Sequence, residues 1–178
     1  ALSNVSDERL ASEVIKRGFK LIRIPKRGAA YARREVLRFA FEHEQVCDVY
    51  HYCDLDRLVT WLATEVEELK CTIPQLLGAD YVVIGRTEQA FKSHPVEWQE
   101  TEKWTNHVFS LAIGEKADVT AGSAGLSRRA LGIIVKDLPN AKAKMTDAEW
   151  PLLVRRKQAN TIIITLFVNA VRLKRMSY

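Results

Sequence analysis

The hydrophobic and polar positions of this 178-residue chain follow two different periods. In the first half, stretches with apolar residues at helical spacing are separated by short apolar runs that end at proline, an acidic residue or glycine. This pattern predicts helices and strands in the order α-β-α-β-α-β. Strands are expected at Phe19–Ile24, Cys47–Cys53 and Tyr81–Gly85. The helices are marked by three apolar stripes: Leu10, Ala11, Val14 and Ile15; Ala32, Val36, Phe39 and Ala40; and Leu58, Leu62, Val66 and Leu69.

The second half of the chain predicts longer helices and one more strand. A polar connection over 86–95 leads into a helix expected at Val96–Ile113. A loop over 114–125 follows, and Ser127 is expected to cap the next helix because its hydroxyl can accept from a free backbone N–H. After one further helix, Thr161–Val168 is the last predicted strand.

The order of elements also predicts the fold class. Parallel strands need crossover connections, which the helices between the strands provide. We therefore expect an α/β fold with a doubly wound, mostly parallel sheet and helices on both faces. No internal repeat, low-complexity tract or proline-rich linker divides the chain, so residues 1–178 are expected to form a single domain.

Composition narrows the range of partners. The 27 Lys and Arg residues exceed the 22 Asp and Glu residues slightly, and they are scattered among the acidic ones, so nucleic acid is not an expected partner. The three cysteines, Cys47, Cys53 and Cys71, are odd in number and lack C-x-x-C spacing, which favours a cytoplasmic protein without disulfides. The longest apolar run, Ile162–Val168, is far shorter than the ~20 residues of a membrane helix. Membrane association is expected to be peripheral at most.

Two carboxylates, Asp54 and Asp56, directly follow the apolar and aromatic run over 49–53. Alternate residues of an extended segment share a face, so both side chains are expected to reach one divalent cation, or a cation and a ribose hydroxyl. Ligands of open α/β sheets collect beyond the carboxyl ends of the strands, which suits this position. The alternative is that Asp54 ends the strand and Asp56 caps the following helix.

Six short segments follow one another at regular intervals: Ser3–Asp7, Arg27–Arg33, Asp54–Asp56, Val83–Arg86, Asp118–Arg128 and Thr146–Glu149. In this order they resemble motifs of the family-two glycosyltransferases of the GT-A fold. The motifs are the DDGSxD turn, the G-x-x-x-A-R segment, the metal-binding Asp-x-Asp, the V-x-G-S/T-R strand end, the D-x-T-S-G-x-R-x-F-S-R segment and the acidic catalytic-base motif. A single short motif carries little weight, but their common order strengthens the resemblance.

The resemblance implies metal-dependent, inverting transfer of a sugar from a nucleotide diphosphosugar to an unknown acceptor. Asp54 and Asp56 would bind Mg²⁺ or Mn²⁺, and Asp147 would be the catalytic base that takes the proton of the acceptor hydroxyl. The implied nucleotide-sugar contacts are Asn4, Asp7, Arg33, Asp54 and Arg86.

Three alternatives stay open. Thr146-x-x-Glu149 is also a capping box, which would explain the acidic motif by helix capping. A phosphatase of the haloacid-dehalogenase type also places Asp-x-Asp after an apolar strand. A non-catalytic GT-A-like binding domain is the third, because the chain departs from the family pattern. The usual first strand is not found before Ala1, Asn4 stands where an acidic residue is common, and Ala124 stands where an arginine is common.

Overall fold

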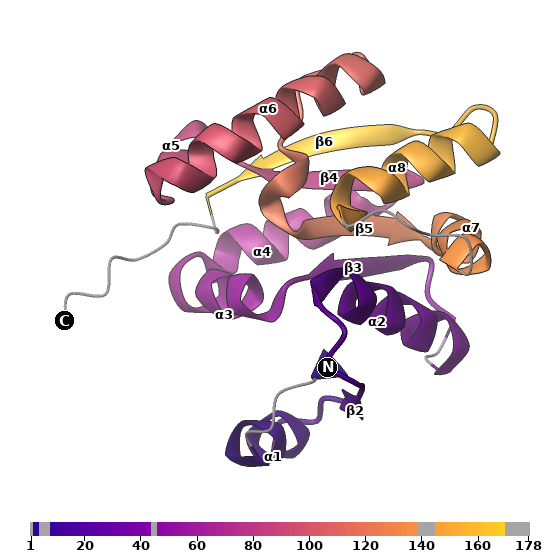
Figure 1. Ribbon diagram of the computed structural model, residues 1–178. Helices are drawn as coiled ribbons and strands as arrows, with labels where there is room; N and C mark the ends of the chain where they lie inside the picture. Colours follow the sequence, from indigo (N-terminus) through magenta and orange to yellow (C-terminus); the bar gives the residue numbers. More distant parts are fainter. Residues whose placement is uncertain (1, 4–7, 44–45, 139–144, 170–178) are drawn as a thin grey trace.

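A computed structural model describes residues 2–3, 8–43, 46–138 and 145–169 of the chain (Figure 1). In chain order, the elements are β1 (Leu2–Ser3), α1 (Glu8–Lys16), β2 (Ile22–Arg23), α2 (Ala29–His43), β3 (Val49–Cys53), α3 (Leu55–Thr64), α4 (Val66–Thr72), the 3-10 helix η1 (Ile73–Leu76), β4 (Tyr81–Arg86), α5 (Glu88–Lys92), α6 (Val96–Ile113), the 3-10 helix η2 (Val119–Ala121), β5 (Ser123–Ser127), α7 (Arg128–Asp137), α8 (Thr146–Lys157) and β6 (Ile163–Val168). The protein has a mixed α/β fold.

An open four-stranded sheet with the order β3-β5-β4-β6 forms the centre of the molecule (Figure 1). β4 and β6 pair in parallel, whereas β5 lies between β3 and β4 and runs antiparallel to both. The sheet is therefore mixed: β3, β4 and β6 run in one direction, as expected, but two of the three strand pairs are antiparallel. β5 was not predicted because its sequence, Ser-Ala-Gly-Leu-Ser, is typical of a loop. Gly125 is needed there, since a Cβ would lie 2.9 Å from Leu76 Cδ2.

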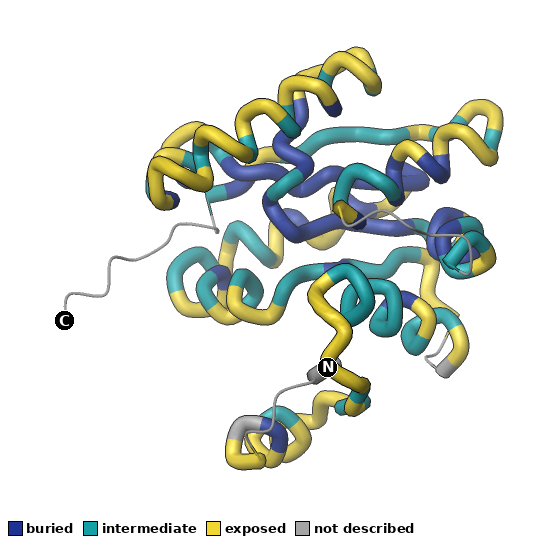
Figure 2. Tube along the Cα trace, in the orientation of Figure 1, coloured by how far each residue is buried: buried dark blue, intermediate teal, exposed yellow. Residues whose placement is uncertain are grey.

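Helices cover both faces of this sheet, as predicted. Side chains alternate along a strand, so Tyr81 and Val83 of β4 face one cluster of buried residues while Val82 and Ile84 face another. The first cluster is built with α2, α6, α7 and α8, and the second with α3 and η1. Figure 2 shows the result: β4 is buried throughout, whereas the edge strand β3 is half-buried over most of its length.

Several element boundaries also differ from the prediction. The expected strand at Phe19–Ile24 shrinks to β2, which pairs in parallel with β1 in a separate two-stranded sheet. The helix expected over 58–69 is broken at Glu65 into α3 and α4, and the polar connection over 86–95 contains α5. In contrast, α6 has the predicted bounds, and Ser127 Oγ accepts from Ala130 N at 3.1 Å as the cap of α7.

Within the described part of the chain, the helices are too short or too polar to cross a lipid bilayer.

Candidate functional site

The candidate site lies at the carboxyl end of β3. Asp54 follows this strand at the N-cap position of α3, but its side chain makes no capping hydrogen bond. Its carboxylate instead accepts from Arg33 of α2, whose Nη2 lies 2.5 Å from Oδ2 and whose Nε lies 3.3 Å from Oδ1. The hydroxyl of Tyr52, on β3, also donates to Oδ1. Asp54 is thus held by its own strand and by a neighbouring helix.

Asp147 reaches the same guanidinium from the first turn of α8. Arg33 Nη1 lies 2.7 Å from Asp147 Oδ2, although the two residues are 114 positions apart in the sequence. Arg33 therefore bridges two carboxylates from different elements. Asp54, Arg33 and Asp147 were each predicted from a separate motif, and the fold brings all three into contact; we call them the Arg33 cluster.

The capping box offered as an alternative for Thr146 and Glu149 does not form. The N-cap of α8 is Met145, without a side-chain capping bond, and Glu149 forms an ion pair with Arg34 at 2.8 Å. Two ion pairs to α2 thus hold the first turn of α8. Asp147 is positioned by tertiary contacts.

The electrostatics of the cluster separate its members. Burial raises the pKa of Asp147 above its usual value of 3.8; Arg33 partly offsets this shift, and the negative charge of Asp54 adds to it. Burial lowers the pKa of Arg33, but the charge of Asp147 and the hydrogen bond to Asp54 outweigh it and raise the pKa overall. Arg33 therefore stays cationic. A carboxylate with a raised pKa is a better proton acceptor near neutral pH, which suits Asp147 to a role as base.

Asp56 is not placed as predicted. β3 ends at Cys53 and α3 begins at Leu55, so Asp54 and Asp56 do not lie along one extended segment. Asp56 is instead an exposed residue in the first turn of α3. Its negative charge there is stabilised by the positive end of the helix dipole. The prediction assumed that the strand continued past Cys53.

The donors present fit a particular kind of metal site. In the described residues, no three or more His, Cys, Asp or Glu side chains are grouped to hold a metal by themselves. However, Mg²⁺ is usually held by one or two carboxylates, with substrate phosphates and water as the remaining ligands, and Mn²⁺ favours the same oxygen donors. Asp54, whose side chain is 25% exposed, and the exposed Asp56 are donors of this kind, although the strand does not carry them on one face. A metal at Asp54 would therefore depend on a diphosphate for further ligands.

A close backbone approach shapes one side of the site. Gly122, directly after η2, accepts from Asp54 N through its carbonyl oxygen at 3.0 Å. Its φ is +70°, and a Cβ at this position would lie 2.7 Å from Asp54 Oδ2 and 3.0 Å from Arg57 Nε. The roles of Gly122 and Tyr52 were missed in the sequence. Gly122 lies inside the motif-like segment Asp118–Arg128, and this position is the signal in the sequence that could have identified it.

Arg86 makes its hydrogen bonds outside the Arg33 cluster, and its expected phosphate contact stays a prediction. Its side chain has no exposed surface. Its Nε and Nη2 lie 2.6 and 2.8 Å from the two oxygens of Asp118, and Nη2 also lies 2.7 Å from Glu102 and 2.8 Å from Thr120. Carboxylates of the protein hold this guanidinium, while its Nη1 has no hydrogen-bond partner among the described residues, and Arg86 borders a cavity of about 390 Å³. The other expected nucleotide contacts, Asn4 and Asp7, lie outside the described residues.

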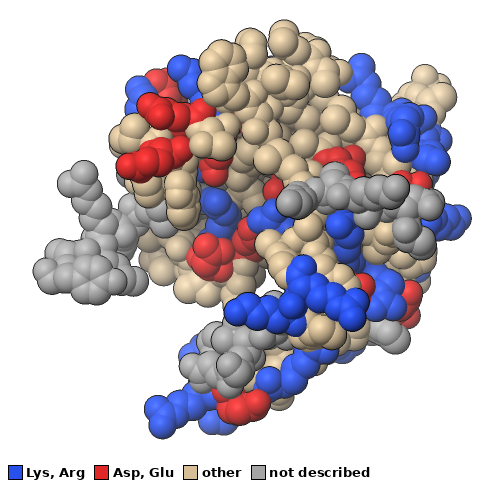
Figure 3. Space-filling model, in the orientation of Figure 1, with Lys and Arg blue, Asp and Glu red and all other residues tan. Residues whose placement is uncertain are grey.

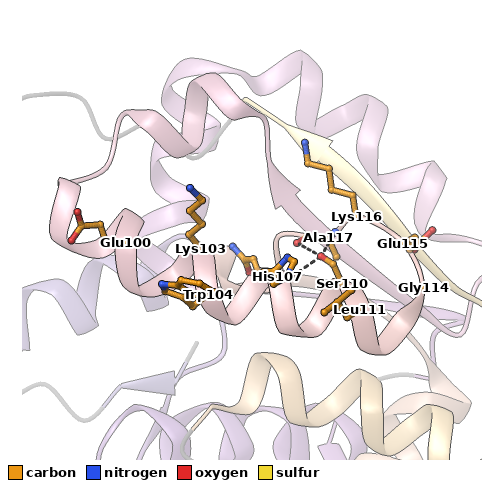
Figure 4. Close-up of a pocket in the computed structure, with 11 residues that line it drawn as sticks. Glu100, Lys103, Trp104, His107, Ser110, Leu111, Gly114, Glu115, Lys116 and Ala117 are labelled. Atoms are coloured by element: carbon orange, nitrogen blue, oxygen red, sulfur yellow. Dashed lines mark hydrogen bonds between the residues drawn. The ribbon is translucent and has the colours of Figure 1, made fainter.

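A cavity of about 1100 Å³ lies elsewhere. It borders α6 and is lined by residues that include Trp104, His107 and Leu111 (Figure 4). A second cavity of about 550 Å³ lies along β3 and α2 and is lined in part by Tyr52, which touches the Arg33 cluster, and by His51. Burial lowers the pKa of His51 to about 4, so this imidazole is neutral at neutral pH.

No protein-family model, curated protein or solved structure matches the chain. The Arg33 cluster and the motifs that supply its residues are therefore the features that bear on function.

Proposed function

We propose that this protein is a GT-A-type glycosyltransferase that uses Mg²⁺ or Mn²⁺ to transfer a sugar, with inversion, from a nucleotide diphosphosugar to an acceptor hydroxyl. The observation that carries the proposal is the Arg33 cluster. Its members come from three motifs that were recognised independently in the sequence, and random matches would have no reason to meet at one end of a strand.

The chemistry of the residues agrees with this activity. A divalent cation at Asp54 and Asp56 would offset the negative charge that develops on the leaving diphosphate. Asp147, with its raised pKa, would accept the proton of the acceptor hydroxyl. Arg33 has a planar guanidinium that can bind phosphate oxygens in pairs, and its side chain is 23% exposed.

The distribution of basic residues supports a polyanionic ligand beside the site. Residues 16–34 contain eight Lys and Arg and no Asp or Glu: Lys16, Arg17, Lys20, Arg23, Lys26, Arg27, Arg33 and Arg34. The basic residues are thus less evenly scattered than expected. In Figure 3, Lys and Arg side chains gather over the lower part of the view, around the segment that joins α1 to α2. Four of the eight, Lys16, Arg23, Arg33 and Arg34, form ion pairs with carboxylates from other segments. The excess of basic residues that remains in this segment would attract a diphosphate.

The test is binding and turnover with the intact chain. Calorimetry with UDP, GDP, CDP, ADP and dTDP, with and without Mn²⁺, is expected to find one nucleoside diphosphate that binds in a metal-dependent way. Asp54→Asn and Asp56→Asn should remove the metal dependence. Asp147→Asn should retain this binding and lower sugar transfer or donor hydrolysis by about a hundredfold or more, since it removes the base.

A matched control is Asp48→Asn, which alters an exposed aspartate just before β3 and should leave binding and turnover unchanged. Absence of metal-dependent binding for every diphosphate would reject the proposal. Full binding with no turnover for any donor would favour the non-catalytic domain. Hydrolysis of aryl phosphates that depends on Asp54 would favour the phosphatase.

A further inference from the structure

Arg33 occupies the coordination sites that a metal at Asp54 would need. A carboxylate offers about four lone-pair directions. Three of those of Asp54 are directed at hydrogen-bond donors, namely Arg33 Nε, Arg33 Nη2 and the Tyr52 hydroxyl. In this arrangement the positive charge beside Asp54 is the guanidinium itself.

The same guanidinium also neutralises Asp147, at 2.7 Å. Without Arg33, the carboxylates of Asp54 and Asp147 would lose the guanidinium that contacts both, and Arg57 would remain as the nearby cation. Two carboxylates that share a site repel each other, and a neighbouring cation relieves that repulsion whether it is an arginine or a metal ion. Arg33 and a divalent cation can therefore each neutralise the two carboxylates. Because both are positively charged, they repel each other and do not bind Asp54 at the same time.

The Arg33 side chain is also exposed enough to move away from Asp54. Its side chain is 23% exposed, and those of Asp54 and Asp147 are 25% and 14% exposed. By contrast, the guanidinium of Arg86 is enclosed in the core. A long side chain at the edge of the fold can change rotamer without opening the core, and incoming phosphate oxygens would offer the Arg33 guanidinium a new partner.

We propose that Arg33 is a resident counter-ion that competes with the divalent cation for Asp54, and so sets the metal affinity of the site. It is a positioning residue, because it acts through Asp54. The inference rests on the proposed function, since that function places the metal at Asp54. It adds that metal binding is weak while Arg33 holds Asp54, and becomes stronger once a diphosphate draws the guanidinium away.

The test measures Mn²⁺ binding to the intact chain without nucleotide, from the electron paramagnetic resonance signal of free Mn²⁺. Arg33→Met removes the charge and keeps the apolar stem, and it is expected to bind Mn²⁺ about tenfold more tightly than the wild type, a typical size for coupling between two ligands. Arg33→Lys keeps the charge but loses the fork, and should lie between the two. A purely structural role for Arg33 would weaken metal binding in both variants.

Arg38→Met is the matched control. It removes another arginine of α2, which pairs with Glu35 outside the Arg33 cluster, and should leave the Mn²⁺ affinity unchanged. Equal, weaker or undetectable Mn²⁺ binding by Arg33→Met would overturn the inference, and Arg33→Lys applies the same criterion if Arg33→Met fails to fold.

The two proposals fail in different ways. Tighter Mn²⁺ binding by Arg33→Met, together with no nucleoside diphosphate binding, would reject the glycosyltransferase and keep the counter-ion. Metal-dependent binding of a nucleoside diphosphate by the wild type, together with unchanged Mn²⁺ affinity in Arg33→Met, would do the reverse. As a second readout, the diphosphate that binds should raise the Mn²⁺ affinity of the wild type more than that of Arg33→Met.

Discussion

Two arginines of this protein have the same kind of partners in different surroundings. Arg33 bridges Asp54 and Asp147 at the end of the edge strand β3, and Arg86 pairs with Asp118 and Glu102 at the end of the inner strand β4. The side chain of Arg86 has no exposed surface, whereas that of Arg33 is 23% exposed. Chemistry alone does not separate the two sites; access to solvent does.

The difference shows what each site can do. The Arg86 guanidinium, on β4, donates to acceptors on α6 and on the segment around η2 and stacks on Phe91, so these contacts hold three parts of the fold together. The Arg33 guanidinium makes just as many hydrogen bonds, four, but its side chain is 23% exposed, so a ligand can reach it. The segment from Asp118 to Gly122 joins the two, since Asp118 binds Arg86 and Gly122 binds the backbone of Asp54.

The largest expected effect comes from removing each arginine in turn. Arg86→Met should lower the free energy of unfolding by about 3–5 kcal/mol, because Asp118 would be left as an uncompensated buried charge. Arg33→Met should lower it by less, about 1–2 kcal/mol, because these side chains are partly exposed, although Asp54 and Asp147 would then repel each other. Urea unfolding of both variants measures the comparison. Equal losses would mean that the Arg33 cluster is part of the structural framework and would remove the contrast.

The sequence predicted much of the fold where local signals agree with tertiary packing. The bounds of α6 and the capping role of Ser127 are confirmed because periodicity and capping are local properties. β5 could not be found from propensity, since its small residues are selected by close contact with Leu76 and Val82 rather than by strand preference. Because β5 was not predicted, the two antiparallel strand pairs that it forms were missed as well.

The candidate site was predictable in part, and for a similar reason. The order of the motifs identified Asp54, Asp147 and Arg33, which meet in the structure. Arg86 was grouped with them because an arginine in a motif carries no sign of its burial, which depends on distant residues such as Asp118 and Glu102. The position of Asp56 was predicted wrongly because the end of the strand was misplaced: α3 begins directly after Asp54, at Leu55.

A smaller effect is expected from the segment that joins the two sites. Gly122→Ala should cost about 2–3 kcal/mol of stability, from a left-handed φ of +70° and from the displacement of Asp54 by the new Cβ. It should also weaken Mn²⁺-dependent binding of a nucleoside diphosphate. The matched control is Gly114→Ala, whose φ is +85° but whose Cβ would meet nothing within 4 Å. That variant should cost about 1 kcal/mol and leave binding unchanged. Equal effects of the two on binding would separate Gly122 from the site.

The smallest effect is in the titration of the two carboxylates, which should shift in opposite directions. For Asp118, burial raises the pKa, but the hydrogen bonds and charge of Arg86 outweigh it and hold the pKa below the usual 3.8. For Asp147, burial prevails over Arg33 and the pKa lies above 3.8. Carbon-13 NMR titration of the labelled carboxyl groups, assigned with the Asn variants, measures both.

The consequences for stability have opposite signs. Asp118 contributes stability above pH 3.8, which is lost as the pH falls through its folded-state pKa, because the unfolded chain then binds the proton more readily. Asp147 binds its proton more tightly in the folded state, so its contribution falls as the pH rises from 3.8 through its folded-state pKa. Asp147→Asn should therefore flatten the decline in unfolding free energy above pH 3.8, and Asp118→Asn should flatten the loss below it. Two pKa values on the same side of 3.8 would show that the two arginine sites are electrostatically alike, and that exposure does not separate the binding site from the structural one.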